Sequence, residues 1–329
     1  MTMSPEKFKD KCKGIFPVQF CPMTEDGELN LEGLRENTQF LVDFAKKGNK
    51  DVVVITNGST TEFYANTIEE QKNVIKTTVE TVGGEIPVVV GVSHSGTKET
   101  VKMAKYAEEV GADCVLVVHP YYHTPTRQGL YEHYKRVADA VEIGVMLYNN
   151  PSVSGVLLPP SLLKELSKIE NIVAMKDNSG LALKYLQYSL KTDPDDMVLI
   201  NGNGELKFLG SIGYGLRYKG FVTHFANFAP SFSYRIYELA MEGKLEEAYE
   251  ALKETLPYWD LLSELAGKQE SVSILPESYR ANLMYMSAGK AAMDLVGLNG
   301  GPLRLPLMSL TEKEKEKLDE VLKEIGIKS

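Results

Sequence analysis

The segment IPVVVGVSHSGTKETVKMAKYAEEVGADCVLVVH (86–119) decides the fold class, because two apolar runs in it flank a stretch with helical spacing. The runs IPVVVGV and DCVLVVH are continuous and rich in β-branched residues, which is typical of strands buried on both faces of a parallel sheet. Between them, Val101, Ala104 and Val110 fall close to one helix face. Gly111 is a suitable stop at the end of that helix. The segment therefore predicts a strand, a helix and a second parallel strand.

The same alternation recurs along the first 225 residues of the chain. Six further apolar runs are GIFPVQF (14–20), DVVVIT (51–56), IGVMLYN (143–149), NIVAMK (171–176), MVLIN (197–201) and GFVTHF (220–225). Eight strand candidates that alternate with helices predict an α/β fold of the (β/α)8 TIM-barrel type. A doubly wound sheet is the structural alternative, but no G-x-G-x-x-G motif opens a helix after the first strand. NGNGELKFLG (201–210) has the wrong glycine spacing for that motif and is expected to be a loop.

The pattern changes at about residue 229, after which the chain contains no strand-like run. Helical spacing continues from there to the C-terminus, and no Gly/Ser linker separates the two parts. We therefore expect residues 1–228 to form the barrel that carries the active site. Residues 229–329 are expected to form a C-terminal helical region packed on the barrel.

Composition excludes several classes of partner. The chain has 329 residues, of which 43% are hydrophobic and 25% charged, as in ordinary globular proteins. Its formal net charge of -9 argues against nucleic acid and anionic membranes as partners.

The three cysteines, Cys12, Cys21 and Cys114, form no C-x-x-C pair, which indicates a reducing compartment and no structural zinc. The start of the chain is polar and no apolar run approaches the roughly 20 residues of a membrane span, so a cytoplasmic location is expected.

In a (β/α)8 barrel the residues just after each strand form the catalytic face. Hydroxyls, phenols and one lysine follow the predicted strands, whereas no cluster of metal ligands does, so we expect neither a metal nor a cofactor. These residues are Ser59, Thr60 and Glu62 after the second strand, Tyr121 and Tyr122 after the fourth, Tyr148 at the end of the fifth, Lys176 at the end of the sixth, and Gly202 and Glu205 after the seventh. His224, on the eighth strand, either lines a pocket or sits in the barrel wall.

Lys176 ends the apolar run NIVAMK and has two possible uses. It can be a strand-end lysine whose ammonium reaches solvent. Alternatively, burial lowers the pKa of the amine, and the neutral amine attacks a ketone to form a Schiff base. Tyr148 and Thr60 are suited to relay the protons of that reaction, and a turn at Gly58–Thr60 can bind the carboxylate of a keto acid.

Purely structural roles for the same residues are the alternative interpretations. Tyr148 can be a core aromatic residue with a bonded hydroxyl. Ser59 and Thr60 can cap the helix that follows them, in an arrangement with Glu62 that is similar to a capping box. His119 and His123 lie four residues apart but straddle Pro120 on a predicted loop, which does not favour a metal site.

Four motifs occur in the order of a known family. They are GSTTEF (58–63), PYY (120–122), YNNP with a later glycine (148–155), and the lysine of AMKDNSG (174–180). With these motifs the sequence resembles the superfamily of dihydrodipicolinate synthases and N-acetylneuraminate lyases, which are pyruvate-dependent class I aldolases. The resemblance extends over nearly the whole chain.

The resemblance implies a role for each matched residue. Lys176 would be the Schiff-base lysine and Tyr148 the proton-relay tyrosine. Ser59 and Thr60 would bind the keto-acid carboxylate, and Thr60 would also take part in the relay. Tyr122 would reach the active site of a neighbouring subunit, which implies a homo-oligomer, usually a tetramer built as a dimer of dimers.

Departures from the family pattern bear on the second substrate. Where synthases of the lysine precursor have an arginine after Y-N-x-P, this chain has Val153. The loop NGNGE (201–205) resembles N-G-Y-D-E of sialate lyases, so Gly202 and Glu205 would hold a polyhydroxylated tail. Gly204 replaces the aspartate of that loop, which argues against sialic acid itself.

The sequence thus predicts a lyase that joins pyruvate to a small aldehyde, or cleaves the product, with a sugar-derived 2-oxo acid favoured. Two alternatives within the same chemistry are dihydrodipicolinate synthesis and dehydration of a deoxy-oxo sugar acid. An alternative of another class is a barrel that binds keto acids without catalysis. Lys176 and Tyr148 argue against that alternative, because a binding protein needs neither an amine nor a relay.

Overall fold

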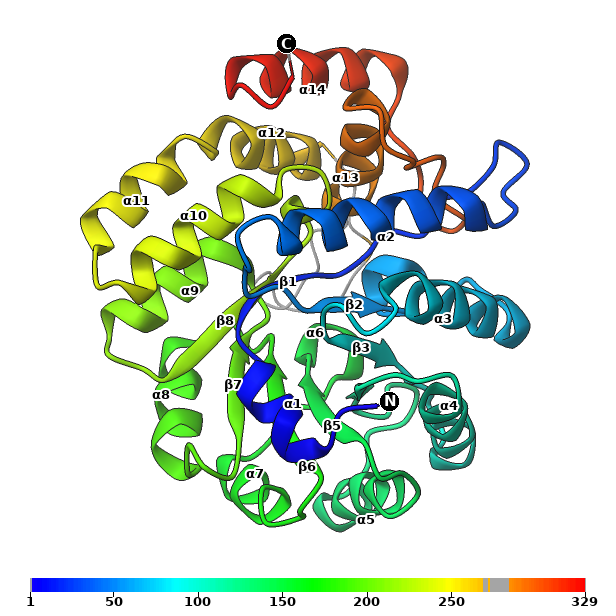
Figure 1. The fold of residues 1–329 in the computed structure, drawn as a ribbon, viewed down its shortest axis with the longest axis vertical. Coiled ribbons are helices and arrows are strands. Elements are labelled where there is room, and N and C mark those ends of the chain that lie inside the picture. Colours follow the sequence, from blue (N-terminus) through cyan, green and yellow to red (C-terminus); the bar gives the residue numbers. More distant parts are fainter. Residues whose placement is uncertain (1, 269–271, 273–283, 329) are drawn as a thin grey trace.

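Eight parallel strands form a nearly closed barrel, as Figure 1 shows for the computed structural model, which describes residues 2–268, 272 and 284–328. The strand order is β1-β8-β7-β6-β5-β4-β3-β2. The strands are β1 (Gly14–Pro17), β2 (Val54–Thr56), β3 (Val88–Gly91), β4 (Cys114–Val118), β5 (Gly144–Asn149), β6 (Ile172–Asp177), β7 (Val198–Asn201) and β8 (Tyr218–Thr223). Isolated bridges from Ile15 to Val52 and from Val18 to Ile55 join β1 to β2. The predicted TIM barrel is confirmed.

Burial on both faces of the sheet explains why the strands have continuous apolar sequences. Val89, Leu116 and Met146 belong to a cluster made almost entirely of strand residues, which fills the barrel interior. Their chain neighbours Val90 and Val115 belong to a second cluster, shared with the surrounding helices. Successive strand residues therefore alternate between two apolar environments, and neither face is left for polar residues.

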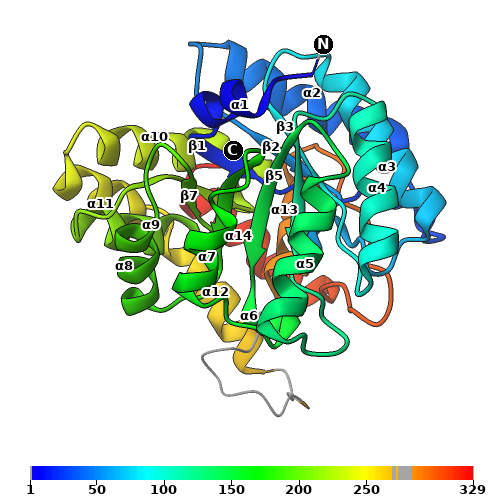
Figure 2. The same cartoon turned by 90° about the horizontal axis from the view of Figure 1, so that it is seen from below.

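Most helices surround the barrel on the outside, whereas α1 lies across one end of the barrel and α6 lies at the other (Figures 1 and 2). The helices of this part are α1 (Pro5–Lys11), α2 (Leu31–Lys46), α3 (Ile68–Val82), α4 (Thr97–Glu109), α5 (Arg127–Ala138), α6 (Pro151–Ser154), α7 (Pro160–Leu166), α8 (Ala182–Lys191), α9 (Gly204–Gly213) and α10 (Pro230–Met241). The helix at 204–213 shows that the expected loop at NGNGELKFLG is wrong for most of its length. Phe208 and Leu209 are fully buried in the core, so packing favours a helix there.

The last part of the chain is helical wherever it is described. Its helices are α11 (Leu245–Lys253), α12 (Leu256–Gly267), α13 (Met284–Leu295) and α14 (Glu312–Glu324). The side chains of α12, α13 and α14 form an apolar cluster of their own together with residues that follow β8. The beginning of the predicted helical segment PESYRANLMYMSAGK lies outside the described residues. The expected domain limits at 228 and 229 stay a prediction.

The C-terminal helices lie against the end of the barrel that matters for function. Figure 2 shows the strands from the side, with α6 and α12 at the end toward which the arrow of β5 points. A buried ion pair between Lys290 of α13 and Glu62 fastens this region to the barrel, with Nζ 2.9 Å from Oε1. No helix within the described residues has both the length and the apolar character that a membrane span requires.

Candidate active site

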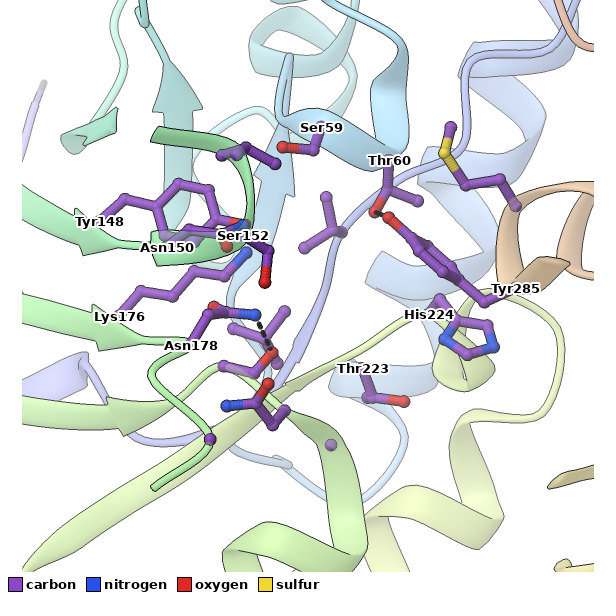
Figure 3. Close-up of a pocket in the computed structure, with 18 of the residues that line it drawn as sticks. Ser59, Thr60, Tyr148, Asn150, Ser152, Lys176, Asn178, Thr223, His224 and Tyr285 are labelled. Carbon is purple, nitrogen blue, oxygen red and sulfur yellow. Dashed lines mark hydrogen bonds between the residues drawn. The ribbon is translucent and has the colours of Figure 1, made fainter. Parts of the chain in front are cut away.

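A cavity of about 680 Å³ opens at the carboxyl ends of the barrel strands. Barrel residues form one part of its wall, and residues of α12 and α13 form another (Figure 3). Of the ten candidate residues at the predicted strand ends, eight line it: Ser59, Thr60, Tyr121, Tyr148, Lys176, Gly202, Glu205 and His224. The topology brings them together because the cavity lies where the strands end.

Lys176 is buried in the cavity wall with only 5% of its surface exposed. Its Nζ lies 4.1 Å from the centre of the Tyr148 ring, and among the described residues no carboxylate forms an ion pair with it. Burial lowers the pKa of the amine to about 7. The interpretation of Lys176 as a lysine that reaches solvent is therefore wrong, and much of this amine is unprotonated near neutral pH.

The neighbouring carboxylate, Asp177, belongs to a different network. Successive residues of a strand point to opposite faces, so Asp177 points away from the side on which Lys176 lies. Its Oδ1 accepts hydrogen bonds from Asn149 Nδ2 (2.9 Å) and the Ser179 backbone N–H (2.9 Å), and its Oδ2 accepts from the Tyr218 hydroxyl (3.0 Å). This network occupies the carboxylate and leaves the amine without an acidic partner.

Tyr148 has polar partners on the cavity side. Its hydroxyl accepts a hydrogen bond from Asn150 Nδ2 at 2.8 Å. Burial raises the pKa of Tyr148, and hydrogen bonds with Asn150 and with Ser59 oppose that shift. The hydroxyl adjacent to this phenol is thus that of Ser59.

Ser59 and Thr60 belong to a short 3-10 turn, η1 (Ser59–Thr61), and not to a helix cap. The helix that follows, α3, begins at its own cap, where Thr67 and Glu70 form a reciprocal pair of hydrogen bonds. The capping interpretation is therefore wrong. Thr61 holds the turn, because its hydroxyl accepts from the Gly58 backbone N–H and donates to the Gln19 carbonyl at 2.8 Å.

Thr60 has a partner that the sequence did not reveal. Its hydroxyl lies 3.3 Å from the hydroxyl of Tyr285, which comes from α13 of the C-terminal region (Figure 3). The two residues are 225 positions apart, and no motif connects them. The Tyr285 ring packs on His224, with ring centres 5.0 Å apart, and Trp259 of α12 lines the cavity beside them.

His224 lines the cavity, which was one of its two predicted positions. Its Nε2 lies 3.0 Å from the Tyr258 hydroxyl. Burial lowers the pKa of His224 to about 3, so the imidazole is neutral. It can take part in hydrogen bonds with a substrate but is a poor source of protons.

Glu205 is fully buried and carries one oxygen without a partner. Oε1 accepts hydrogen bonds from the Thr223 hydroxyl (2.7 Å) and the Ser233 hydroxyl (2.6 Å). Oε2 has no hydrogen-bond partner among the described residues, and neither has Asn178 Oδ1 nearby. Burial raises the pKa of the Glu205 carboxyl. Both unpartnered oxygens belong to residues that line the cavity and are suited to accept hydrogen bonds from a ligand.

Gly202 is needed for the shape of this part of the wall. A Cβ atom at this position would lie 1.8 Å from Asn178 Oδ1, which excludes any other residue without rearrangement. The backbone carbonyl of Gly202 accepts a hydrogen bond from Asn178 Nδ2 at 2.8 Å. Gly202 therefore positions the Asn178 amide at the edge of the cavity.

Tyr122 and Glu62 are the candidate residues that do not line the cavity, and only Tyr122 has a catalytic role implied by the family resemblance. Its side chain is 80% exposed, whereas its neighbour Tyr121 lines the cavity. A contribution from Tyr122 requires a second subunit, so its role and the homo-oligomer stay predictions. His119 is buried and bonded to Tyr134 and Asn149 rather than paired with His123.

Comparison with known proteins agrees with the fold and the cavity. Residues 11–325 match the sequence model of the dihydrodipicolinate synthetase family. The chain belongs to this family. Members of the dihydrodipicolinate synthetase family are pyruvate-dependent enzymes of the class I aldolase type, so this protein is an enzyme, a lyase of that type.

Individual relatives in the family cover almost all of the chain. The 4-hydroxy-tetrahydrodipicolinate synthase of Archaeoglobus fulgidus is 32% identical over 315 residues, which is 96% of this chain and 99% of the relative. The enzyme of the same name from Acetivibrio thermocellus is 34% identical over 307 residues, with coverage of 93% and 94%. The crystal structure of dihydrodipicolinate synthase from Aquifex aeolicus is similar with a TM-score of 0.81 at 29% identity, covering 96% and 98%.

The names of these relatives favour one alternative of the sequence analysis over its first choice. They are synthases of the dihydrodipicolinate type and not sugar-acid aldolases. One similar structure, with a TM-score of 0.81, 29% identity and coverage of 96% and 97%, is described as a monomeric dihydrodipicolinate synthase variant. Similarity within the family therefore does not determine the oligomeric state of this chain.

Proposed function

We propose that this enzyme binds pyruvate as a Schiff base on Lys176 and condenses it with an aldehyde. The observation that carries the proposal is the state of the Lys176 amine. It is buried beside Tyr148, none of the described carboxylates forms an ion pair with it, and burial lowers its pKa to about 7. Such an amine is nucleophilic at neutral pH, and it faces a cavity that can hold a keto acid.

Formation of the Schiff base needs a proton at the carbonyl oxygen. The amine attacks C2 of pyruvate, the carbonyl oxygen takes up one proton, and the nitrogen loses one. Departure of that oxygen as water takes a second proton and leaves a protonated imine, so one proton is consumed overall. Tyr148 is the nearest phenol to the amine and would carry these protons, with Ser59 beside its hydroxyl. The turn η1 that bears Ser59 and Thr60 would hold the pyruvate carboxylate.

The imine then activates the methyl group of pyruvate. Loss of a proton from C3 gives an enamine, whose C3 forms a carbon–carbon bond with the carbonyl carbon of an aldehyde. The protonated imine is restored in that step, and water releases the product from Lys176. The reverse sequence cleaves an aldol, so one site supports both directions.

The first candidate for the complete reaction is 4-hydroxy-tetrahydrodipicolinate synthesis, in which the aldehyde is aspartate semialdehyde. Its support is similarity, since relatives of that name match more than nine-tenths of the chain. The family resemblance implies an arginine for the second carboxylate, and Val153 stands at that position at the cavity edge. Under this candidate the second carboxylate would have to be bound by a group other than an arginine at position 153.

A second candidate, aldol chemistry on a polyhydroxylated 2-oxo acid, is favoured by the polar atoms of the cavity. Lys176 is the only lysine or arginine among the described residues that line it. Glu205 Oε2 and Asn178 Oδ1 are acceptors that have no partner in residues 2–268, 272 and 284–328, as hydroxyl groups of a sugar tail would require. Gly202 and Glu205 would then be the tail-binding residues.

Reductive trapping tests the proposal. The protein is incubated with pyruvate and borohydride, and its intact mass is measured. We expect one reduced pyruvate per chain, located on Lys176 by peptide mapping and absent from Lys176→Ala. A wild-type chain that stays unmodified would contradict the proposal and favour a barrel that only binds keto acids.

A panel of aldehydes with pyruvate then separates the two candidates. Efficient condensation with aspartate semialdehyde supports the synthase. Preference for glyceraldehyde or a longer sugar aldehyde, with loss of that preference in Glu205→Gln, supports the second candidate.

A further inference from the structure

The cavity contains two pairs of a phenol and an aliphatic hydroxyl, although the Schiff-base step uses only one. Tyr148 pairs with Ser59, and the Tyr285 hydroxyl lies 3.3 Å from the hydroxyl of Thr60. Ser59 and Thr60 are adjacent in the turn η1, so both pairs depend on the same turn. Figure 3 shows Lys176 and Tyr148 on one side of the cavity, and Tyr285 with His224 on the opposite side.

The position of Tyr285 is fixed by an anchor five residues later in the same helix. Lys290 Nζ donates to Glu62 Oε1 (2.9 Å), to the Cys21 carbonyl (2.8 Å) and to the Pro302 carbonyl (2.6 Å). Glu62 directly follows the turn that carries Thr60. The helix with Tyr285 and the turn with Thr60 are therefore joined twice, through a hydroxyl pair in the cavity wall and through a buried ion pair.

The remaining chemistry of the proposed reaction needs a proton on the side away from Lys176. When the enamine attacks the aldehyde, the aldehyde oxygen becomes an alkoxide and must be protonated. An aldehyde bound between pyruvate on Lys176 and the opposite wall of the cavity would meet Tyr285, which Figure 3 shows on that wall. We propose that the Tyr285 hydroxyl donates the proton to the aldehyde oxygen as the carbon–carbon bond forms, so that the C-terminal helical region supplies a catalytic group within the same chain. This inference rests on the proposed function.

The step balances in atoms and charge. The enamine carbon and the aldehyde carbon form a bond, the electron pair of the aldehyde C=O bond moves to oxygen, and that oxygen takes the proton of Tyr285. The imine nitrogen becomes positively charged and the phenol becomes a phenolate. Thr60 can return a proton from water to the phenolate, since its hydroxyl both donates and accepts. In the cleavage direction the same proton returns to the phenolate.

Two features of the surroundings fit Tyr285 as the donor. Burial raises the pKa of Tyr285 to about 12, so the phenol keeps its proton at neutral pH until an alkoxide forms beside it. The nearest alternative is His224, whose imidazole is neutral and whose Nε2 is engaged by Tyr258. Tyr64 also lines the cavity, but the partner of its hydroxyl is the sulfur of Met286.

The test separates the two halves of the reaction in Tyr285→Phe, which keeps the ring and removes the hydroxyl. Exchange of the pyruvate methyl protons in D2O, followed by NMR without aldehyde, reports imine and enamine formation. Condensation with an aldehyde reports the whole sequence. We expect methyl exchange and borohydride trapping at the wild-type rate, with kcat for condensation lower by roughly 10²–10⁴-fold and the KM for the aldehyde little changed.

Tyr148→Phe should behave differently, because it slows exchange and condensation together. Tyr237→Phe is the matched control, since Tyr237 is a buried tyrosine of the C-terminal region that does not line the cavity. It should leave both rates unchanged. Thermal unfolding of each variant shows that the fold is intact.

Several outcomes would overturn the inference. One is condensation by Tyr285→Phe at the wild-type rate. Another is an equal loss of exchange and condensation in that variant, which would indicate a general effect on the site. A third is a loss of condensation in Tyr122→Phe but not in Tyr285→Phe, which would assign the proton to a neighbouring subunit. Absence of both trapping and exchange in the wild type would instead reject the proposed function.

Discussion

Two buried lysines, Lys176 at the end of β6 and Lys290 in α13, show what distinguishes a reactive amine from a structural one. Their side chains are equally withdrawn from water, with 5% and 1% exposed. Lys290 donates to three oxygen atoms, one of them the carboxylate of Glu62, which uses the three donors of an ammonium group. Lys176 has a phenol ring beside it and, within the part of the chain that the structure describes, no carboxylate partner. Burial alone therefore does not make a nucleophile, because the partner decides which protonation state is stable.

The first way to test this contrast is Lys176→Met, which keeps an unbranched apolar stem. We expect condensation to fall by at least about 10⁴-fold, because the covalent intermediate cannot form. The free energy of unfolding at pH 7 should not fall, since the variant removes a buried amine that has no ion-pair partner among the described residues. Steady-state kinetics and urea unfolding measure the two quantities. Substantial residual activity in this variant would show that another nucleophile carries the reaction.

The second test is Lys290→Met, in which we expect the main loss in the free energy of unfolding and not in the chemical step. Removal of one partner leaves Glu62 as a buried charge without compensation, which costs about 3–5 kcal/mol of stability. The double variant Lys290→Met/Glu62→Leu should regain part of that loss. Lys102→Met, which removes an exposed pair with Glu99, is the control and should unfold like the wild type. If Lys290→Met unfolded at the same urea concentration as this control, the buried pair would have no structural role.

The third and smallest effect is the pH dependence of Lys176. With a pKa of about 7, the rate of trapping pyruvate should rise about fivefold from pH 6 to pH 7 and level off above pH 8. The free energy of unfolding also depends on pH, because the pKa of Lys176 differs between the folded and the unfolded chain. Between pH 7 and 10.5 the folded state binds fewer protons at Lys176 than the unfolded state, so the wild type gains stability relative to Lys176→Met as the pH rises through that window. A trapping rate that still increased tenfold per unit above pH 8 would contradict a depressed pKa.

The fold was predictable because each strand carries its own signal. Runs such as VVVI and VLVV can satisfy both faces of a strand only in a sheet covered on both sides, and eight such runs leave few architectures. The helix at 204–213 was missed because the glycines at its start are typical of a loop, although a glutamate in the first turn favours a helix. Burial of Phe208 and Leu209 outweighs that local preference.

The site was predictable only where chain order and strand ends determine position. Lys176 and Tyr148 follow from the barrel rule, since neighbouring strands bring them together. Tyr285, Trp259 and Lys290 come from helices whose apolar spacing indicates that one face is buried. That spacing does not indicate what the face packs against. The pairings with Thr60 and Glu62 join residues more than 220 positions apart and have no signature in a single sequence.

The ion pair between Glu62 and Lys290 also implies an order in which the walls of the cavity form while the chain is synthesised. A ribosome releases the turn with Thr60 early and the helix with Tyr285 late, with 225 residues between them. Lys176 and Tyr148 can meet on a nascent barrel, but the opposite wall is added only when α12 and α13 emerge. A growing chain of this kind acquires its amine first and encloses it later, so enzymatic competence appears only after most of the barrel has been synthesised.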